Sequence, residues 1–514
     1  MLVLINRMNG IGAITMDKYR RQFILSENEL SGYDAWNQGK INNALYVYIH
    51  PDLNFTQARD ENHEVELSLI GYMIDPTHPD SSDLQIIENI VAAAGASFEK
   101  AIEATFPLGG RWILIFSSRE GVKMFSDPCG LRTVYFTNNE AKEFMAASQP
   151  GIINDHLNFS ISAFAQSGYL ETKSYTDQIE YWVPSGVTLY DEISHLIPNH
   201  YLDVNLKKQF RFWPSSELPQ IKLKEGVEKA AALIEGLVLA ASQRFHLAIA
   251  VTAGIDSRVI MAATRKLNNK IRYYTLIYYK LNELSPDIRI PEKLLAKAGR
   301  QHEVYDCSGE MDDEFREIYM NNVDTAHPAW GNIAFGIRKW FPENYVAVKG
   351  NCSEIATKSY YKYSYPEVID AVTLAQLSKF DDSPFAQKAI DAWLKDSYDV
   401  AEKYNYEILD LYYWEIKMGS WQATSQLEWD IVQEVFAPFN CRALLIHMLG
   451  VNVKHRSPFN NRLHKGIVRK LWPLMLTVPR NPIPLQRVII RTIRLLKAKP
   501  TYIFIKNHIK TVLS

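Results

Sequence analysis

The segment that decides the fold is HLAIAVTAGIDSRVIMAATRKL, residues 246–267. Its LAIAV run is aliphatic and too short for a helix, which indicates a buried strand. The small residues Thr252, Ala253 and Gly254 predict a tight turn, and the apolar positions after them have helical spacing. In a strand, turn and helix of this order, backbone N–H groups and the helix dipole face an anion. The segment therefore predicts a phosphate-binding loop.

Two polar side chains at the predicted helix start fit the same interpretation. The hydroxyl of Ser257 can bind a phosphate oxygen, and Asp256 can hold a Mg²⁺ ion that neutralises a leaving pyrophosphate. A chance strand, turn and helix remains the alternative for this segment taken alone.

The segments that follow continue the alternation of strands and helices. RYYTLIYY (272–279) predicts a second strand, and a helix and another strand follow within 285–305. Ser285 and Asp287 stand where that helix begins, and we expect both to act as helix caps. YVAVKGNCSEIATKSYY (345–361) predicts a strand, a glycine turn and then an acidic residue. The second half is therefore predicted to be an α/β domain.

The first 215 residues have mostly the pattern of β-structure. One segment, 87–106, has helical spacing, and a strand is predicted at 109–118 after a Gly-Gly turn. Residues 121–137 predict two strands joined through Asp-Pro-Cys-Gly, and 184–205 closes with a turn and another short strand.

The order of motifs in this first half resembles the N-terminal domain of the asparagine synthetase family. The matching positions are Gly110, Arg111, Asp127, Gly130, Tyr135, Phe136, Thr188, Ile193, Leu196, Pro198 and Leu202. The resemblance implies an Ntn-type β-sandwich covered by helices, a class II glutamine amidotransferase domain. Residue 2 is Leu2 where the family has its nucleophilic cysteine, and Cys129 is the first cysteine. We therefore expect a structural shell without glutaminase activity, because that chemistry needs a thiol beside its own α-amine.

The second half is similar to the ATP-pyrophosphatase domain of the same family, with Rossmann-like α/β topology. Thr-Ala-Gly-Ile-Asp-Ser stands where the family has Ser-Gly-Gly-x-Asp-Ser. The resemblance implies that ATP is cleaved between its α- and β-phosphates. It also implies the following ATP contacts: Val251, Thr252, Ala253, Gly254, Ile255, Asp256, Ser257, Leu276, Lys349 and Gly350. Gly299 and His302 match the end of the helix that Ser-Pro-Asp opens in the family.

Catalytic and metal-binding roles follow from the same resemblance. Asp256 and Glu354 are the expected Mg²⁺ ligands, although the family's loop Ser-Gly-x-Gly-x-Asp-Glu is shorter here and lacks the first of its two carboxylates. A family lysine that stabilises the leaving pyrophosphate is expected between Lys454 and Lys470, and Lys465 is our choice. Asp256, Glu354 and Lys465 are therefore the predicted catalytic residues.

Residues 418–451 have the pattern of an amphipathic helical region broken at Pro438. Glu434, Pro438 and Phe439 resemble the family's Glu-x-x-x-Pro-Phe stretch, with Arg442 beyond. The usual arginine two residues after the glutamate is Phe436 here. We expect the aromatic side chains Trp414, Trp421, Trp429 and Phe436 to belong to the core.

Composition agrees with a protein of two domains, at 1–215 and 216–480, followed by a tail at 481–514. The 514 residues are 47% hydrophobic, no apolar run approaches a membrane span, and the first residues lack the pattern expected of a secretory signal. The four cysteines form no CxxC pair, which favours a reducing cytoplasm over zinc or disulfide frameworks. After Glu434 there is no acidic residue. The amphipathic basic segment 485–499 predicts either a helix packed on the acidic body or contact with a membrane surface or a partner.

These observations predict an ATP-dependent ligase that joins carbon to nitrogen through an acyl-adenylate, with ATP and Mg²⁺ as cofactors. The acid would be a small molecule, a peptide or a sugar acid. The nitrogen would come from ammonia, from a partner amidotransferase or from an amine of the substrate. A non-catalytic nucleotide-binding scaffold and an RNA-modifying enzyme of the same superfamily are the alternatives. The absence of CxxC motifs argues against the latter, and no nucleic-acid partner is expected.

Overall fold

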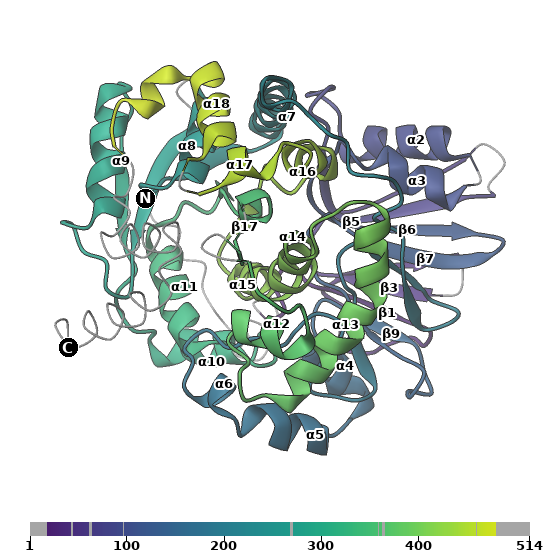
Figure 1. Ribbon diagram of the computed structural model, residues 1–514. Helices are drawn as coiled ribbons and strands as arrows, with labels where there is room; N and C mark the ends of the chain where they lie inside the picture. The colour runs from purple at the N-terminus through teal and green to yellow at the C-terminus, as the bar shows by residue number, and fades with distance from the viewer. Residues whose placement is uncertain are drawn as a thin grey trace.

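The computed structural model describes residues 18–479, apart from 43–44, 61–63, 96, 268–270, 358, 362–364 and 459. Leu2 and the basic segment 485–499 lie outside the described residues, so the predictions made for them stay predictions. The described part contains no helix long and apolar enough to cross a membrane. It forms a mixed α/β structure with two antiparallel sheets in the first half and one parallel sheet in the second (Figure 1).

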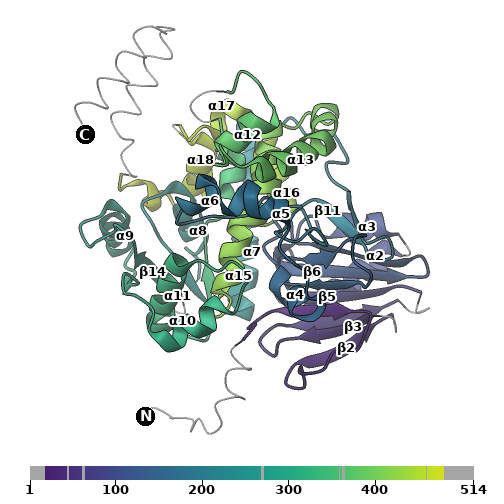
Figure 2. The same cartoon turned by 90° about the horizontal axis from the view of Figure 1, so that it is seen from below.

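The first antiparallel sheet has the strand order β10 (Ile193–His195), β8 (Tyr135–Thr137), β9 (Met145–Ala147), β1 (Phe23–Ser26), β3 (Leu45–Ile49) and β2 (Asn37–Ile41). The second has the order β12 (Lys208–Arg211), β11 (His200–Asp203), β7 (Gly121–Ser126), β6 (Gly109–Ser118), β5 (Glu66–Ile74) and β4 (Phe55–Arg59). The sheets share a core that includes Phe23 and Val47 from one sheet and Ile113 and Met124 from the other. This layered arrangement confirms antiparallel sheets packed face to face in the first half (Figure 2).

Helices cover the outer face of the second sheet (Figure 2). α2 (Asp83–Ala94) and α3 (Phe98–Ala104) replace the single helix predicted at 87–106. Gly95 ends α2 with a positive φ of 53°, and Ser97 caps α3 by accepting a hydrogen bond from the N–H of Lys100. The predicted helix is therefore two helices, because a glycine at a left-handed position stops the first one. The strands predicted at 109–118 and 121–137 are confirmed.

Four helical segments follow β9 in the first half, namely α4 (Pro150–Leu157), α5 (Ala163–Ala165), the π-helix η1 (Gln166–Leu170) and α6 (Lys173–Thr176). α4 packs against β8 and β9, whereas η1 contacts α13 (Pro384–Lys403) of the second half. Helical segments of the two halves therefore pack against each other on this side.

The second half is built on a five-stranded parallel sheet. Its strand order is β15 (Glu303–Asp306), β14 (Arg272–Ile277), β13 (His246–Ala250), β16 (Tyr345–Val348) and β17 (Glu434–Phe436). In chain order this is 3-2-1-4-5, the order of a doubly wound sheet. The connections reverse direction between β13 and β16, so this is the point where a crevice opens at the carboxyl ends of the strands.

Helices pack on both faces of this sheet. Val259 and Ile260 of α8 (Ile255–Ala263) lie in one core cluster with Val346 and Val348, and that face also carries α7 (Leu223–Arg244) and α18 (Arg462–Leu471). The opposite face packs Ala347 against α11 (Pro328–Trp340). The remaining helices of this half are α9 (Pro286–Lys297), α10 (Asp313–Met320), η2 (Ser353–Thr357), α12 (Ala371–Leu377), α14 (Ile408–Tyr412), η3 (Tyr413–Gln422), α15 (Ala423–Trp429), α16 (Arg442–Leu449), α17 (Val453–Arg456) and η4 (Pro473–Leu476).

The region predicted as one broken helix, 418–451, differs from that prediction. It contains the end of η3, then α15, strand β17 and α16. The strand forms because Glu434, Val435 and Phe436 pair in parallel with β16. The prediction was wrong here because three residues are too few to show a strand pattern, and a tertiary partner determines their conformation. Trp414 and Phe436 are fully buried, as predicted, whereas Trp421 and Trp429 are half-buried.

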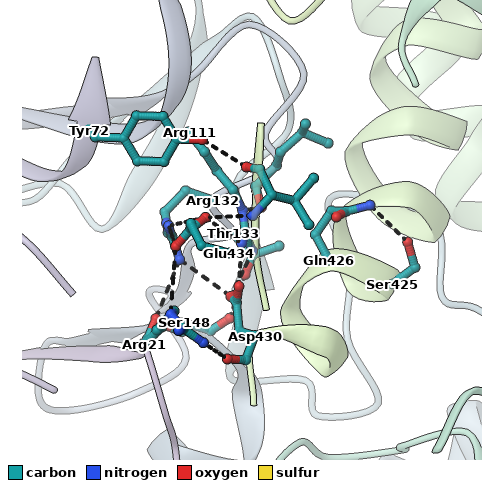
Figure 3. Close-up of polar contacts among 12 residues, drawn as sticks. Arg21, Tyr72, Arg111, Arg132, Thr133, Ser148, Ser425, Gln426, Asp430 and Glu434 are labelled. Carbon is teal, nitrogen blue, oxygen red and sulfur yellow. Dashed lines mark hydrogen bonds and ion pairs between the residues drawn. The ribbon is translucent and has the colours of Figure 1, made fainter. Parts of the chain in front are cut away.

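A buried ionic network joins the sheets of the first half to β17 and α15 (Figure 3). Arg111 pairs with both carboxylate oxygens of Asp430, with 2.8 Å between Nη2 and Oδ2, and both side chains are 1% exposed. Arg132 lies 3.3 Å from Asp430 and 3.1 Å from Glu434. The hydroxyl of Tyr72 donates to the carbonyl of Val435 at 2.8 Å. Arg111, which matched the family pattern, therefore binds the second half together with Arg132 and Tyr72.

A second set of contacts extends the same junction. Asn440 donates to the carbonyl of Gly110 at 2.9 Å and to Asp127 at 2.7 Å. Arg211 binds both oxygens of the buried Glu415, at 2.7 and 2.9 Å. Buried charges of this kind are tolerated because each is paired and hydrogen-bonded.

Candidate functional site

The predicted phosphate loop lies at the carboxyl end of β13, the central strand of the parallel sheet. Val251 is buried and fixed by its neighbour strand: its N–H donates to the carbonyl of Tyr274 at 2.8 Å, and its own carbonyl accepts from Thr275 Oγ1 at 2.6 Å. Since the Thr275 hydroxyl has one proton, His302 Nε2 donates to it at 2.8 Å. The predicted site residue Leu276 follows on β14, half-buried and paired with Tyr305 of β15.

Side chains within the loop hold its backbone in shape. Ser257 Oγ accepts from the N–H of Thr252 at 3.1 Å and donates to the Thr252 carbonyl at 3.1 Å. Thr252 Oγ1 accepts from the N–H of Gly254 at 3.3 Å. Gly254 is the N-cap of α8, and the N–H groups of the first helical turn, Ile255 to Ser257, have no acceptor within the helix. These amides and the positive end of the helix dipole can bind an anion.

Asp287 contributes a contact that the sequence did not predict. Its carboxylate accepts from the N–H of Ala253 at 3.0 Å. The start of α9 therefore holds the phosphate loop in place, although the two residues are 34 positions apart in the sequence. Ser285 is the N-cap of α9 but makes no side-chain capping bond. It exchanges hydrogen bonds with Asn282 instead. Ser285 is thus at the predicted N-cap position, but the prediction that its side chain caps the helix is wrong, because its hydroxyl bonds to Asn282; Asp287 lies in the first turn, and its bond to Ala253 gives it a role besides capping.

The loop after β16 meets the loop after β13. Gly350 lies so close to α8 that an added Cβ would be 3.2 Å from the Asp256 backbone and from the Ser257 nitrogen. Ser353 donates to Asp256 Oδ1 at 2.5 Å, and His464 Nε2 donates to Ser353 Oγ at 2.9 Å. Two loops from either side of the switch point and the buried α18 histidine therefore converge on one carboxylate.

Glu354 is the second predicted metal ligand, and it begins η2 beside Ser353. Burial and the nearby charge of Asp256 raise the pKa of its carboxyl to about 8. Among the described residues, its Oε2 atom has no hydrogen-bond partner. The Asp256 side chain is 31% exposed. Two mutually repelling carboxylates, one with an uncommitted buried oxygen, form a donor set that fits a divalent cation. No cluster of three or more such side chains suitable for a metal occurs in the described ranges.

Lys349 precedes Gly350 and is 9% exposed. Its Nζ atom lies 4.3 Å from the centroid of the Trp429 ring and, within the described part of the chain, has no hydrogen-bond acceptor. Burial and the charge of Arg111 lower the pKa of this amine to about 7, although Asp430 opposes the shift. Its environment is therefore more typical of a functional group than of a solvent-exposed lysine.

Lys465, the predicted catalytic lysine, lies on α18 and lines a groove of about 720 Å³ between α18 and α7, together with Val227 and Glu228. The preceding residue, His464, is the one that faces Asp256, at 3.6 Å. The catalytic role of Lys465 stays a prediction. Sequence reasoning missed Ser353 and His464, because a serine in a short loop and a histidine in a basic helix carry no distinctive pattern.

No protein-family model and no curated protein sequence matches the chain. Among solved structures, one match is glutamine phosphoribosylpyrophosphate amidotransferase from B. subtilis complexed with ADP and GMP. It has 10% identity and a TM-score of 0.25, covering 65% of this chain and 90% of that one. Another is described as the allosteric regulatory enzyme of purine biosynthesis, with 11% identity, a TM-score of 0.26, and coverage of 65% and 89%. The chain thus has a distant likeness to glutamine amidotransferases, too weak to carry an argument about its activity.

Proposed function

We propose that this protein is an ATP-dependent ligase that activates a carboxylate as an acyl-adenylate and transfers it to an amine. The observation that carries the proposal is the meeting of two loops at the switch point of the parallel sheet. Asp256 after β13 and Ser353 after β16 are joined by a hydrogen bond there. In open α/β sheets, ligands bind in the crevice at this point.

The loop after β13 is suited to phosphates rather than to a neutral ligand. Its residues are small, Thr252 is exposed, and the first-turn amides of α8 have no acceptor within the helix. Asp256 would repel phosphate unless a cation lies between them. In our proposal, Asp256 and Glu354 hold Mg²⁺, which would neutralise charge on the leaving pyrophosphate.

The chain's own residues then have separable tasks. The amides of Ile255, Asp256 and Ser257 bind the phosphates, and Ser353 fixes the orientation of the Asp256 carboxylate. The acid's oxygen attacks the α-phosphorus as the bond to the β-phosphate oxygen breaks, and pyrophosphate leaves with the electron pair. An amine then attacks the acyl carbon, the bond from that carbon to the AMP oxygen breaks, AMP leaves with the electron pair, and the nitrogen loses a proton to solvent. We propose ammonia, a partner amidotransferase or a substrate amine as the nitrogen source.

The test is Mg²⁺-dependent exchange of labelled pyrophosphate into ATP, measured with a panel of small, peptide and sugar carboxylic acids. We expect exchange to depend on the acid, and turnover with an amine to release AMP and pyrophosphate in equal amounts. Formation of ADP and phosphate would contradict the adenylation chemistry. Glutamine alone should release no glutamate above the rate without enzyme.

One observation favours a second candidate, a nucleotide-binding scaffold without turnover. Oδ1 of Asp256 is already bound to Ser353, and His464 supports that bond. A carboxylate held in this way could serve the loop's structure alone. Saturable ATP binding without exchange for any acid in the panel would support the scaffold.

A further inference from the structure

The side chain of Lys349 lies on the face of the parallel sheet opposite to α8. Its N–H donates to the carbonyl of Phe436 at 3.0 Å, so its backbone continues the pairing of β16 with β17. Side chains alternate along a strand, and Ala347, two residues earlier, packs against α11. The contact between Nζ and the Trp429 ring confirms that Lys349 points to this face.

The ammonium group of Lys349 has no hydrogen-bonded carboxylate in the described structure. Asp430, the acid whose charge acts on Lys349, is itself hydrogen-bonded to Arg111 and paired with Arg132. The ring face of Trp429 offers partial compensation through a cation–π contact. A buried charge without a hydrogen-bonded partner destabilises a fold. Such a cost is typical of a group that is kept for a ligand.

The position of Lys349 identifies which anion it would receive. The phosphate loop runs into α8, so under the proposed function the departing pyrophosphate would lie toward the α8 face of the crevice. In a displacement at phosphorus, the attacking and leaving oxygens are roughly in line. In that arrangement the attacking carboxylate would enter from the opposite side, the side on which Lys349 lies.

We propose that Lys349 binds the carboxylate of the acid substrate and holds it beside the α-phosphate. This inference rests on the proposed function and adds the residue that recognises the acid. The ammonium offsets the repulsion between an anionic nucleophile and the phosphates. This role would explain why Lys349, which precedes Gly350 and its close contact with Asp256, has no hydrogen-bond acceptor among the described residues.

The test compares Lys349→Met, which keeps the length of the side chain, with the matched control Lys417→Met. Lys417 is also a lysine on aromatic rings, 4.4 Å from the Trp182 centroid and 4.3 Å from the Trp421 centroid. Thermal unfolding of the full chain is measured at pH 7 in sodium acetate and in sodium chloride of equal ionic strength. Acetate is the carboxylate probe, and the difference in Tm between the two salts is the readout.

We expect Lys349→Met to unfold at a temperature equal to or above that of the unmodified protein, because it removes an unpartnered charge. The acetate-specific rise in Tm should be present in the unmodified protein and in Lys417→Met but absent in Lys349→Met. Loss of stability in Lys349→Met, or the same response to acetate with and without Lys349, would overturn the proposal.

A second readout separates the carboxylate from the phosphates of ATP. The family resemblance implied an ATP contact for Lys349, whereas this proposal assigns the residue to the acid. The affinity of Lys349→Met for Mg²⁺-ATP, measured by calorimetry, should therefore stay within about twofold of the unmodified protein. A fall of tenfold or more would assign Lys349 to the nucleotide and overturn the proposal. If the unmodified protein binds acetate through Lys349 yet shows no exchange with any acid, the adenylation function fails while the carboxylate subsite stands.

Discussion

Ser353 donates a 2.5 Å hydrogen bond to Oδ1 of Asp256, and thereby joins the loops that follow two neighbouring parallel strands. Asn in place of Asp256 can still accept this bond through its amide oxygen. The substitution therefore removes charge without removing the contact. This makes Asp256→Asn a specific test of the carboxylate's charge.

Turnover of Asp256→Asn should fall about 10²–10³-fold, because one electrostatic contact to developing charge commonly contributes that much to the rate. ATP binding should be weakened but detectable. The rate is measured as acid-dependent release of pyrophosphate, and binding by calorimetry. Asp313→Asn, at the start of α10, is the matched control and should retain full activity. Unchanged turnover in Asp256→Asn would contradict the proposed metal site.

Gly254→Val should abolish ATP binding while leaving the protein folded. Gly254 has a φ of −64°, which any residue adopts, and an added Cβ would meet only Thr252 Oγ1, at 3.3 Å. The branched side chain would instead occupy the space that phosphate needs beside the loop. Circular dichroism checks the fold, and ATP titration checks binding. Gly309→Val, where no atom lies within 4 Å of the added Cβ, should bind ATP normally.

Asp430→Asn should lower the free energy of unfolding by about 3–5 kcal/mol, because it removes the charge that pairs with both sides of the buried Arg111 guanidinium and leaves only the 3.3 Å contact with Glu434. Urea denaturation measures the change. Asp391→Asn removes a carboxylate from the exposed pair with Lys395, at 2.6 Å, and should change stability by about 0.5 kcal/mol or less. Equal effects of the two substitutions would contradict the importance of the buried junction.

His327 predicts a pH-dependent contribution to stability. Its Nδ1 lies 2.6 Å from Glu428 Oε1 and its Nε2 lies 2.5 Å from the Tyr181 carbonyl, so both ring nitrogens face acceptors and both must donate. Burial alone would lower the pKa of His327, but the Glu428 carboxylate outweighs it and the pKa is raised. The stabilisation is therefore complete below the unfolded pKa of about 6.5 and is lost as the pH rises through the folded pKa.

Urea denaturation between pH 5.5 and 9 tests this prediction. The unmodified protein should lose stability across the upper part of that range relative to His327→Gln, which has no titrating group at this position. His78→Gln is the control, since His78 is exposed beside Asp75 and should keep the profile of the unmodified protein. A pH profile that is the same in His327→Gln and in the unmodified protein would contradict a charged His327.

Local patterns were enough to predict the strand, turn and helix at 246–267, because their hydrophobic periodicity is set within the segment itself. They were not enough to predict β17, whose three residues form a strand only through pairing with β16. The role of Asp287 was hidden for a similar reason. A carboxylate at a helix start looks like a cap, and its bond to Ala253 exists only after β13 and α9 have come together. The position of His464 beside Asp256 could not be predicted either, because it depends on which face of α18 packs on α8.

The junction around Arg111 has a consequence for how the chain is made. Arg111 and Asp430 are 319 positions apart, so during translation the two antiparallel sheets can collapse well before Asp430 leaves the ribosome. Until then the guanidinium groups of Arg111 and Arg132 must stay hydrated. The arrival of α15 and β17 then buries both groups at once and fixes the last strand of the parallel sheet. The N-terminal half would thus act as a template for the folding of the second half. This role does not require the N-terminal half to catalyse a reaction.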